Sequence, residues 1–354
     1  MDWSKIHDQD KMTPATVPLA ALSFLYWAGL KLKMRRPVKK DTLPGFVVSL
    51  GNLTVGGTGK TPAAAMIAQW ALERNYRPAI LSRGYGGKSR HKALEISDGN
   101  ALLATPAEAG DEPYLLAKKL KGVPVIISRD RFDAGLFVYH KHGTNFFILD
   151  DGFQHVKLHR DLDLVLLDAT RPFGNRHLLP WGPLREPLDH LKRAEAFILT
   201  RSGENAALIL MDFLTTRFPG KPVFRSRHMP HKIVFPRSWR SYGPAFLLGK
   251  KVAAFSGIAK PAQFRDTLEK LGAEVLLFKA FPDHYPFSRA QIEEMILQAK
   301  NADCLMTTEK DWVRIENLGI HEDKLCYLTV TFELLSERQD FFAMIREKVQ
   351  GIRP

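Results

Sequence analysis

The chain has 354 residues, which is more than a single hydrophobic core usually organises, so we expect two domains. Hydrophobic residues make up 45% of it and charged residues 25%, the balance of an ordinary globular protein and not of a disordered or fibrous one. The formal net charge of +13 predicts a polyanionic partner: nucleic acid, an anionic lipid surface or a phosphorylated substrate. Cys304 and Cys326 lie in or beside apolar runs, away from any cluster with metal-ligand spacing, which is typical of buried thiols in a reducing, cytosolic compartment.

An apolar stretch near the N-terminus, Val17 to Leu30, predicts a helix associated with a membrane. Its fourteen residues are fewer than the roughly 20 that a helix needs to cross a bilayer. The basic residues that follow it are Lys31, Lys33, Arg35, Arg36, Lys39 and Lys40. A signal peptide would carry its basic cluster before the apolar region, which argues against that interpretation. A helix at the membrane surface is favoured over one packed on the protein itself, because each adjacent basic residue adds about 1 kcal/mol at an anionic surface. The packed helix stays open as the alternative.

From Gly45 onwards, short apolar runs alternate with amphipathic segments, the pattern of parallel strands joined by helices. The expected strands are Phe46 to Leu50, Ala79 to Ser82, Val123 to Ile127, Phe146 to Leu149, Leu162 to Leu167 and Ala196 to Thr200. The expected helices are Thr61 to Arg74, Glu108 to Leu120, Arg131 to His142 and Ala206 to Arg217. The pattern predicts an α/β domain with a doubly wound parallel sheet over residues 41–222, after a membrane-associated segment at 1–40.

A proline-rich and basic stretch, Pro219 to Pro244, interrupts the alternation and is expected to connect two domains. The strands expected after it are Val252 to Phe255, Val275 to Phe278, Cys304 to Thr307 and Leu325 to Val330. The helices expected after it are near Pro261 to Leu271, Arg289 to Lys300 and Leu334 to Val349. The sequence therefore predicts a second, smaller α/β domain, with its linker, over residues 223–354. Ligands of such sheets bind at the carboxyl ends of the strands, so motifs there carry most weight.

The segment Gly51 to Pro62 predicts a phosphate-binding loop of the P-loop NTPase type, because it follows an apolar strand and opens a helix. Its glycines let backbone N–H groups turn toward phosphate oxygens, and the helix N-terminus adds its positive end. Lys60 is expected to hold the β- and γ-phosphates of a nucleoside triphosphate, and Thr61 to ligate Mg²⁺. Thr54 stands where the usual pattern has its first glycine. The expected nucleotide-binding residues are Thr54, Val55, Gly56, Gly57, Thr58, Gly59, Lys60 and Thr61.

Two adjacent acids, Asp150 and Asp151, follow another apolar strand, where a P-loop enzyme places a second carboxylate that organises Mg²⁺. Consecutive side chains at a strand end diverge, so one of them is expected to reach the metal while the other orients a neighbour. A solvated acidic turn is the alternative.

Several further motifs are ambiguous when taken alone. They are Ser82 to Gly87, Gly110 to Pro113, Leu179 to Pro187, Phe281 to Tyr285 and Thr307 to Asp311. Arg83 and Tyr85 are suited to an anionic or sugar-like substrate, but a lone loop of this kind is a weak signal. The acids of Gly110 to Pro113 fit an ordinary helix start. The segment Leu179 to Pro187 fits either a substrate loop or a structural one. His284, in Phe281 to Tyr285, fits either a packed turn or an interdomain cleft. The threonines of the last motif either line the nucleotide or cap the helix at Asp311.

Taken together and in this order, the motifs resemble the tetraacyldisaccharide 4'-kinase family of lipid A biosynthesis over nearly the whole chain. Thr54 agrees with that family's version of the phosphate loop. The resemblance implies transfer of the ATP γ-phosphate to the 4'-hydroxyl of a lipid-linked glucosamine disaccharide 1-phosphate, with ATP and Mg²⁺ required. It also implies a peripheral, monotopic position at the cytoplasmic face of the inner membrane of a Gram-negative bacterium, with the N-terminal helix in the anionic membrane surface.

The resemblance also implies roles for particular residues. Asp111 would accept the proton of the sugar hydroxyl, His284 would pair with it, and Lys60 would neutralise charge on the transferred phosphoryl group. The residues expected to organise Mg²⁺ are Thr61, Asp150 or Asp151, and Glu186. The residues expected to hold the disaccharide and its 1-phosphate are Arg83, Tyr85 and Arg185.

Two other classes of protein compete with this interpretation. A P-loop NTPase switch or a metal-insertion chaperone would hydrolyse nucleotide without a lipid acceptor, and it needs no apolar anchor beside a basic run. A membrane-surface or nucleic-acid-binding module would use only the positive charge. No aromatic–basic RNA motif or DNA-binding helix pattern is present, so nucleic acid is not an expected partner, and no oligomeric state is predicted.

Overall fold

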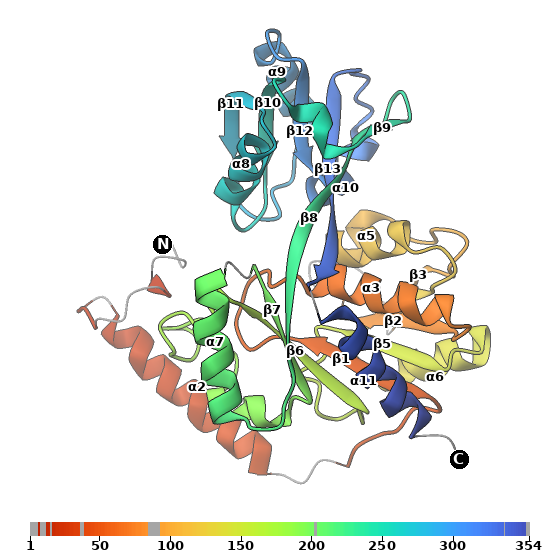
Figure 1. Cartoon of the computed structure of the whole chain (residues 1–354), viewed down its shortest axis with the longest axis vertical. Helices are drawn as coiled ribbons and strands as arrows, with labels where there is room; N and C mark the ends of the chain where they lie inside the picture. The colour runs from red at the N-terminus through yellow and green to blue at the C-terminus, as the bar shows by residue number, and fades with distance from the viewer. Residues whose placement is uncertain are drawn as a thin grey trace.

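The computed structural model describes residues 6–7, 12–14, 16–35, 39–83, 93–201, 204–335 and 337–351. The chain forms a larger lobe and a smaller lobe (Figure 1). Two long strands, β8 (Val223–Phe235) and β13 (Leu325–Leu334), run between the lobes and pair with each other in antiparallel orientation.

The larger lobe is built on a mostly parallel sheet. Its strands are β1 (Phe46–Gly51), β2 (Pro78–Ser82), β3 (Ala93–Ser97), β4 (Val125–Ser128), β5 (Phe146–Asp150), β6 (Leu162–Asp168) and β7 (Ala196–Thr200). Their order across the sheet is β7-β6-β1-β5-β2-β4-β3, and the strands are parallel except for the pair of β3 with β4. Every residue of β1, β5 and β6 is buried, as expected for parallel strands covered on both faces. The doubly wound α/β fold is thereby confirmed.

Helices cover both faces of this sheet. They are α3 (Lys60–Glu73), α4 (Pro106–Ala109), α5 (Asp111–Lys119), α6 (Arg131–His142) and α7 (Glu204–Arg217), with a 3-10 helix η1 (Leu188–Arg193). Alternate residues of a strand point to opposite faces. Val48 accordingly packs in the core beneath α3, and its neighbour Val47 packs in the core beneath α6.

The connection between the lobes is a strand and not an irregular linker. The start of β8 pairs in parallel with β7, and its remainder pairs with β13 and with the short strand β9 (Arg240–Tyr242). Pro230 lies in β8, close to the point where the register of the β8–β13 pair shifts, which is where a strand tolerates a residue without an N–H group. A single sheet therefore continues from one lobe into the other.

The smaller lobe contains the remaining elements before β13. Its strands are β10 (Lys251–Ser256), β11 (Glu274–Ala280) and β12 (Cys304–Thr308). Its helices are α8 (Pro261–Lys270), α9 (Arg289–Gln298) and α10 (Glu309–Ile315), with 3-10 helices η2 (Pro244–Leu247) and η3 (Glu316–Leu318). Cys304 and Cys326 are both buried in its core.

The last helix, α11 (Arg338–Gln350), returns to the larger lobe (Figure 1). Phe342 stacks on Trp70 of α3 with ring centroids 5.1 Å apart. The predicted helix is thus present, but it packs in the core of the larger lobe although it falls within the range 223–354 predicted for the second domain.

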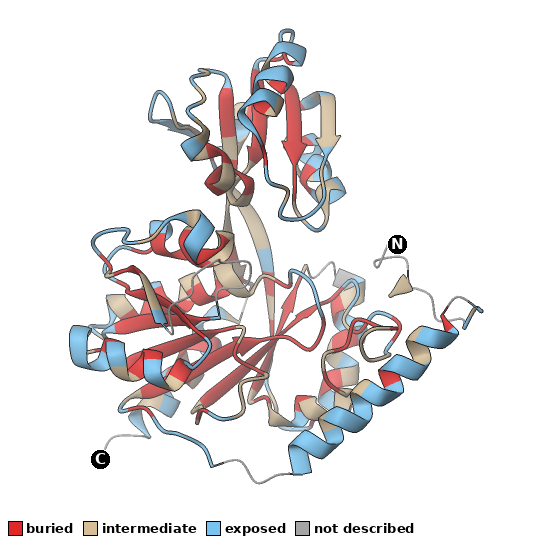
Figure 2. Cartoon of the chain, turned by 180° about the vertical axis from the view of Figure 1, so that it is seen from behind, coloured by how far each residue is buried: buried red, intermediate tan, exposed pale blue. Residues whose placement is uncertain are grey.

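The N-terminal apolar stretch forms α2 (Val17–Arg35), which lies along the outside of the larger lobe and is mostly exposed (Figure 2). Ser23, the only buried side chain described in this helix, exchanges hydrogen bonds with the carbonyl of Leu178 at 2.9 Å and the N–H of Trp181 at 3.0 Å. Phe24 and Leu25 are 64% and 65% exposed. Within the described part of the chain, we find no helix with the length and apolar character needed to cross a membrane.

Candidate functional site

The phosphate loop lies between the end of β1 at Gly51 and the start of α3 at Lys60. Gly56 and Gly59 have φ values of 112° and 84°, which favour glycine strongly. A Cβ atom on Gly59 would also lie 2.5 Å from Cε1 of His228 on β8. The loop therefore requires glycine at these positions, and its N–H groups precede a helix N-terminus, as in an anion-binding site.

Side chains of the loop are held in place around Asn52. Its Nδ2 atom donates to the carbonyl of Thr54 at 2.7 Å, and its Oδ1 atom accepts from Nζ of Lys60 at 3.1 Å. The N–H of Val55 donates to the carbonyl of Pro183 at 2.8 Å, so the segment 178–185 borders the loop. The Oγ1 atom of Thr58 is buried and has no hydrogen-bond partner among the described residues.

Asp150 and Asp151 occupy different environments at the end of β5. Burial, followed by the charges of Glu112 and Asp151, raises the pKa of Asp150 to about 7. Its Oδ1 atom accepts no hydrogen bond from the residues that the structure describes. Asp151 is bound by Lys60 at 3.3 Å and by Arg185 at 2.8 Å, and these cations lower its pKa although burial alone would raise it.

This arrangement fits a divalent cation. An oxygen donor without a partner, buried next to a phosphate loop, is the ligand type that Mg²⁺ prefers. A site for Mg²⁺ with a nucleotide needs only one or two carboxylates, since phosphates and water complete the shell. In the described ranges, no group of three or more His, Cys, Asp or Glu side chains is arranged so that it could hold a metal ion, which is compatible with a site of this kind.

Glu186 is engaged by two other residues. Its Oε2 atom lies 2.7 Å from Nδ1 of His190 and 2.7 Å from NH2 of Arg193. Arg193 also contacts the segment after Asp151, because its Nη2 atom donates to the carbonyl of Phe153 at 3.4 Å. A metal-ligand role for Glu186 stays a prediction; in this structure it holds Arg193, which contacts the segment that follows the two aspartates.

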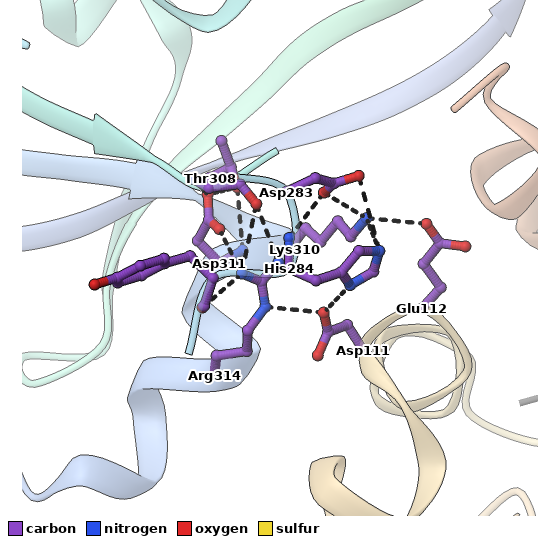
Figure 3. A network of polar contacts seen from close by, with 10 residues as sticks. Asp111, Glu112, Asp283, His284, Thr308, Lys310, Asp311 and Arg314 are labelled. Atoms are coloured by element: carbon purple, nitrogen blue, oxygen red, sulfur yellow. Dashed lines mark hydrogen bonds and ion pairs between the residues drawn. The ribbon is translucent and has the colours of Figure 1, made fainter. Parts of the chain in front are cut away.

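Asp111 and His284 meet across the two lobes (Figure 3). Asp111 begins α5 of the larger lobe, and His284 lies in the loop after β11 of the smaller lobe. Nδ1 of His284 lies 2.8 Å from Oδ2 of Asp111, and Nε of Arg314 on α10 donates to the same oxygen at 2.8 Å. Burial alone would raise the pKa of Asp111, but the hydrogen bond with His284 and the charge of Arg314 outweigh it and lower this pKa.

A lysine and two further acids complete this network. Nζ of Lys310 lies 3.1 Å from Oε1 of Glu112, 3.5 Å from Oδ1 of Asp283 and 3.3 Å from Nε2 of His284. The charge of Glu112 also acts on the buried carboxyl of Asp150. The start of α5 therefore lies near both the interlobe network and the acids beside the phosphate loop.

The motif Thr307 to Asp311 has a structural role at Thr308. Its Oγ1 atom accepts a hydrogen bond from the N–H of Asp311 at 3.1 Å and donates to Oδ2 of the same residue at 2.6 Å. Thr308 is the N-cap of α10, so the capping interpretation is confirmed for this residue. No motif predicted Arg314. It lies four residues after Lys310, one turn further along the same helix, and this spacing could have indicated that the two side chains share a face.

The predicted acceptor-binding residues are placed in part. Arg83 is exposed directly after β2, and Tyr85 lies outside the described residues. Arg185 binds Asp151, and its carbonyl accepts a hydrogen bond from the hydroxyl of Tyr26 on α2 at 2.9 Å. Arg185 thus links the acids beside the phosphate loop to the N-terminal helix.

The arrangement combines the parts needed for phosphoryl transfer. A phosphate loop with its lysine and a buried carboxylate lies beside a carboxylate that a histidine and an arginine hold in place. Such a site can bind a nucleoside triphosphate and remove a proton from an acceptor hydroxyl.

Comparisons with known proteins agree with this chemistry. A family model described as tetraacyldisaccharide-1-P 4'-kinase matches residues 15–350. The tetraacyldisaccharide 4'-kinases of Syntrophus aciditrophicus and Desulfatibacillum aliphaticivorans are 37% and 39% identical over 351 and 356 residues, covering 95% and 96% of this chain and 94% of each relative. A crystal structure of LpxK from Aquifex aeolicus in complex with ATP is 34% identical with a TM-score of 0.77, covering 95% of this chain and 98% of that one. The similarity therefore extends over both lobes and the strands between them.

Proposed function

The chain belongs to the tetraacyldisaccharide-1-P 4'-kinase family, and from this premise we propose that it transfers the γ-phosphate of ATP to the 4'-hydroxyl of a tetraacyl glucosamine disaccharide 1-phosphate in lipid A biosynthesis. The observation that carries the proposal is the pair of Asp111 and His284, joined across the lobes next to a phosphate loop. A switch NTPase or metal-insertion chaperone without a lipid acceptor is not favoured, because the relatives that match over nearly the whole chain are kinases.

The nucleotide is assigned to the phosphate loop. Backbone N–H groups of the segment 54–61 bind the phosphate oxygens, and Lys60 neutralises the charge that develops on the transferred phosphoryl group. In this structure Lys60 is held by Asn52 and Asp151, so its ammonium group already lies beside the carboxylates. We expect these contacts to position Lys60 before ATP arrives.

We assign Mg²⁺ to Asp150 and to the hydroxyl of Thr61, with Asp151 and Glu186 in supporting roles. The support for Asp150 is its buried Oδ1 atom, for which the described residues offer no hydrogen-bond donor. The ion, when bound, withdraws charge from the phosphates of ATP. Asp151 forms ion pairs with Lys60 and Arg185 and so holds both cations beside Asp150. Glu186 forms an ion pair with Arg193, which contacts the segment after Asp151.

Asp111 is assigned as the general base. His284 and Arg314 both bind its Oδ2 atom, and we assign Oδ1 to the sugar hydroxyl. As the hydroxyl oxygen forms its bond with the γ-phosphorus atom, its proton passes to Oδ1, and the bond from phosphorus to the β,γ-bridging oxygen breaks to release ADP. The contacts to Oδ2 support this role because they fix the orientation of the carboxylate.

The acceptor is assigned to the side of the site that faces α2. Arg185 lies between Asp151 and Tyr26, and we propose that Arg185, with Arg83 and Tyr85, holds the disaccharide and its 1-phosphate. The exposed apolar residues of α2 and its basic end, which includes Lys31 and Lys33, suit an anionic membrane surface. We therefore propose a peripheral position on the cytoplasmic face of the inner membrane, where a lipid acceptor is presented.

The decisive experiment follows the labelled phosphate into the lipid. The purified protein is incubated with γ-labelled ATP and disaccharide 1-phosphate lipid in detergent micelles, and the lipid is extracted. We expect label in the lipid for the parent protein and none for Asp111→Asn, whose ATP binding should persist. Continued hydrolysis of ATP by the parent with no label in the lipid would contradict the proposal and favour the switch NTPase.

A further inference from the structure

Lys310 lies at the centre of the network between the lobes (Figure 3). Its Nζ atom contacts Oε1 of Glu112 at 3.1 Å and Nε2 of His284 at 3.3 Å, and it forms an ion pair with Oδ1 of Asp283 at 3.5 Å. A lysine ammonium group has three N–H donors and no lone pair. Two of these contacts are at hydrogen-bond distance with suitable geometry, and the third is an ion pair.

The contact with His284 determines where the imidazole carries its proton. Because the ammonium group can only donate, Nε2 of His284 must present its lone pair. The single proton of the ring then resides on Nδ1, from which it is donated to Oδ2 of Asp111 at 2.8 Å. A doubly protonated ring would place two donors against each other at 3.3 Å, with two positive charges in contact.

We propose that Lys310 is a positioning residue that keeps His284 as the neutral tautomer protonated on Nδ1, and so preserves Asp111 as a proton acceptor. The inference rests on the proposed function, since it assigns Lys310 a part in the reaction of Asp111. Neither the phosphate loop nor the Asp111–His284 pair by itself requires a lysine at this position.

The other charged groups around His284 do not replace Lys310. Oδ2 of Asp283 lies 3.9 Å from Nε2, which is beyond hydrogen-bond distance. Arg314 donates to Oδ2 of Asp111, the atom that Nδ1 of His284 also contacts, and to the carbonyl of Tyr285 at 3.0 Å, so it does not reach Nε2 in place of Lys310. Asp111 itself would favour a charged ring, and Lys310 is the cation in direct contact with Nε2 that opposes it.

The tautomer matters for the reaction. A charged imidazole would bind Asp111 as a full ion pair and reduce the tendency of the carboxylate to accept a proton. A neutral ring still orients the carboxylate of Asp111, because its Nδ1–H group donates to Oδ2. It does not lower the basicity of Oδ1 as a charged ring would, so Oδ1 can accept the proton of the sugar hydroxyl. Lys310 therefore acts on the base through His284 and not by touching the substrate.

The test reads the protonation of the ring directly. The protein is labelled with ¹⁵N-histidine, and the signal of His284 is assigned by its loss in His284→Gln. In the parent at neutral pH we expect one protonated nitrogen and one nitrogen of the acceptor type, as the contacts of Nδ1 and Nε2 require. In Lys310→Met at the same pH we expect this pattern to be lost in favour of a doubly protonated ring. A parent ring protonated on Nε2, or an unchanged ring in Lys310→Met, would overturn the proposal.

Kinetics provide the second readout. Lys310→Met should lower kcat by about 10- to 100-fold, the usual effect of losing a group that orients another, with the KM for ATP nearly unchanged. Lys310→Arg should restore part of the activity, because a guanidinium group also donates to Nε2. Equal activity of Lys310→Met and the parent would contradict the positioning role.

Lys119→Met is the matched control. Lys119 also joins the lobes, through an ion pair with Glu309 at 2.5 Å, but it does not contact His284. Its loss should leave the ¹⁵N pattern of His284 and kcat unchanged; the same effect in both variants would mean that only the joining of the lobes matters. Failure of the proposed function would be distinguishable, since the parent would then phosphorylate no lipid while the tautomer stayed measurable.

Discussion

Nδ1 of His284 lies 2.8 Å from Oδ2 of Asp111, although the two residues are 173 positions apart in the chain. The strands β8 and β13 connect the two lobes, and ion pairs between them, such as that of Lys119 with Glu309, lie near the pair. The contact between His284 and Asp111 contributes little to the packing of either hydrophobic core, since the side chain of His284 is 55% exposed. We propose that the contact orients a carboxylate for proton transfer.

We predict that Asp111→Asn lowers kcat by about 10²- to 10⁴-fold, because the amide cannot accept the proton of the hydroxyl. His284→Gln should lower it less. The double variant should be no worse than Asp111→Asn alone, since His284 acts through Asp111. Steady-state rates of lipid phosphorylation for the parent and the three variants complete a double-mutant cycle. If the fold-loss in kcat of the double variant equals the product of the two single losses, the residues act independently, which would contradict the prediction.

Asp150 and Asp151 should respond to neutralisation with opposite signs. At pH 8 and without Mg²⁺, the buried Asp150 is ionised. Its ionisation lowers the free energy of unfolding by up to about 4 kcal/mol, since its pKa is raised from 3.8 to about 7. Asp150→Asn should therefore stabilise the Mg²⁺-free protein and remove the stabilisation that Mg²⁺ gives the parent. Asp151→Asn should destabilise it, because Lys60 and Arg185 lose their partner.

The measurement is urea unfolding at pH 8 with Mg²⁺ and with chelator. A less stable Asp150→Asn protein under chelating conditions, or one still stabilised by Mg²⁺ to the extent of the parent, would argue against Asp150 as the metal ligand.

The fold was predictable where burial made the sequence pattern simple. The strands β1, β5 and β6 are buried on both faces, so they read as continuous apolar runs. The strand β8 was not predicted, because half-exposed residues, arginines and Pro230 give it neither a continuous nor an alternating pattern. Its pairing with β13 depends on contacts between segments about a hundred positions apart, which local patterns do not report.

The site was predictable to the extent that it is contiguous in sequence. The phosphate loop, from Gly51 to Thr61, carries its own geometry, whereas the acids at the start of α5 look locally like ordinary first-turn carboxylates. Only the family resemblance paired Asp111 with His284. Arg314 was missed, because its role depends on α10 being brought against the other lobe.

The partly buried His228 on β8 should make stability depend on pH. Burial, followed by the charge of Arg201, lowers the pKa of His228 to about 4 from the usual 6.5. Between pH 6.5 and pH 4, His228 is therefore protonated in the unfolded chain but neutral in the folded protein. The contribution of His228 to stability is present above about pH 6.5 and is lost as the pH falls toward 4. Between pH 7 and 5 this loss should be about 2 kcal/mol.

His228→Gln, which does not titrate, should unfold with a smaller loss over the same interval. Urea unfolding of the two proteins at pH 7 and pH 5 measures the difference, and His155, whose pKa is also lowered, remains in both as a common background. Parallel losses in the two proteins would refute the assignment to His228.

The N-terminal helix should bind membranes through its exposed face while its other face stays attached to the protein. Ser23 and Tyr26 hold α2 to the segment 178–185, so substitutions on the opposite side need not release the helix. Each exposed apolar side chain that enters the interface contributes on the order of 1 kcal/mol or more. Phe24→Ser combined with Leu25→Ser should therefore weaken partitioning to vesicles that contain phosphatidylglycerol by more than about tenfold.

The control is Leu297→Ser, which removes an equally exposed leucine from α9 of the smaller lobe. It should sediment with vesicles like the parent, and neither protein should bind strongly to neutral phosphatidylcholine, because the basic end of α2 needs an anionic surface. Activity toward a short-chain, water-soluble acceptor should persist in the α2 variant, since the residues around the phosphate loop are unchanged. Unaltered sedimentation of that variant would instead favour a helix that serves only to pack on the protein.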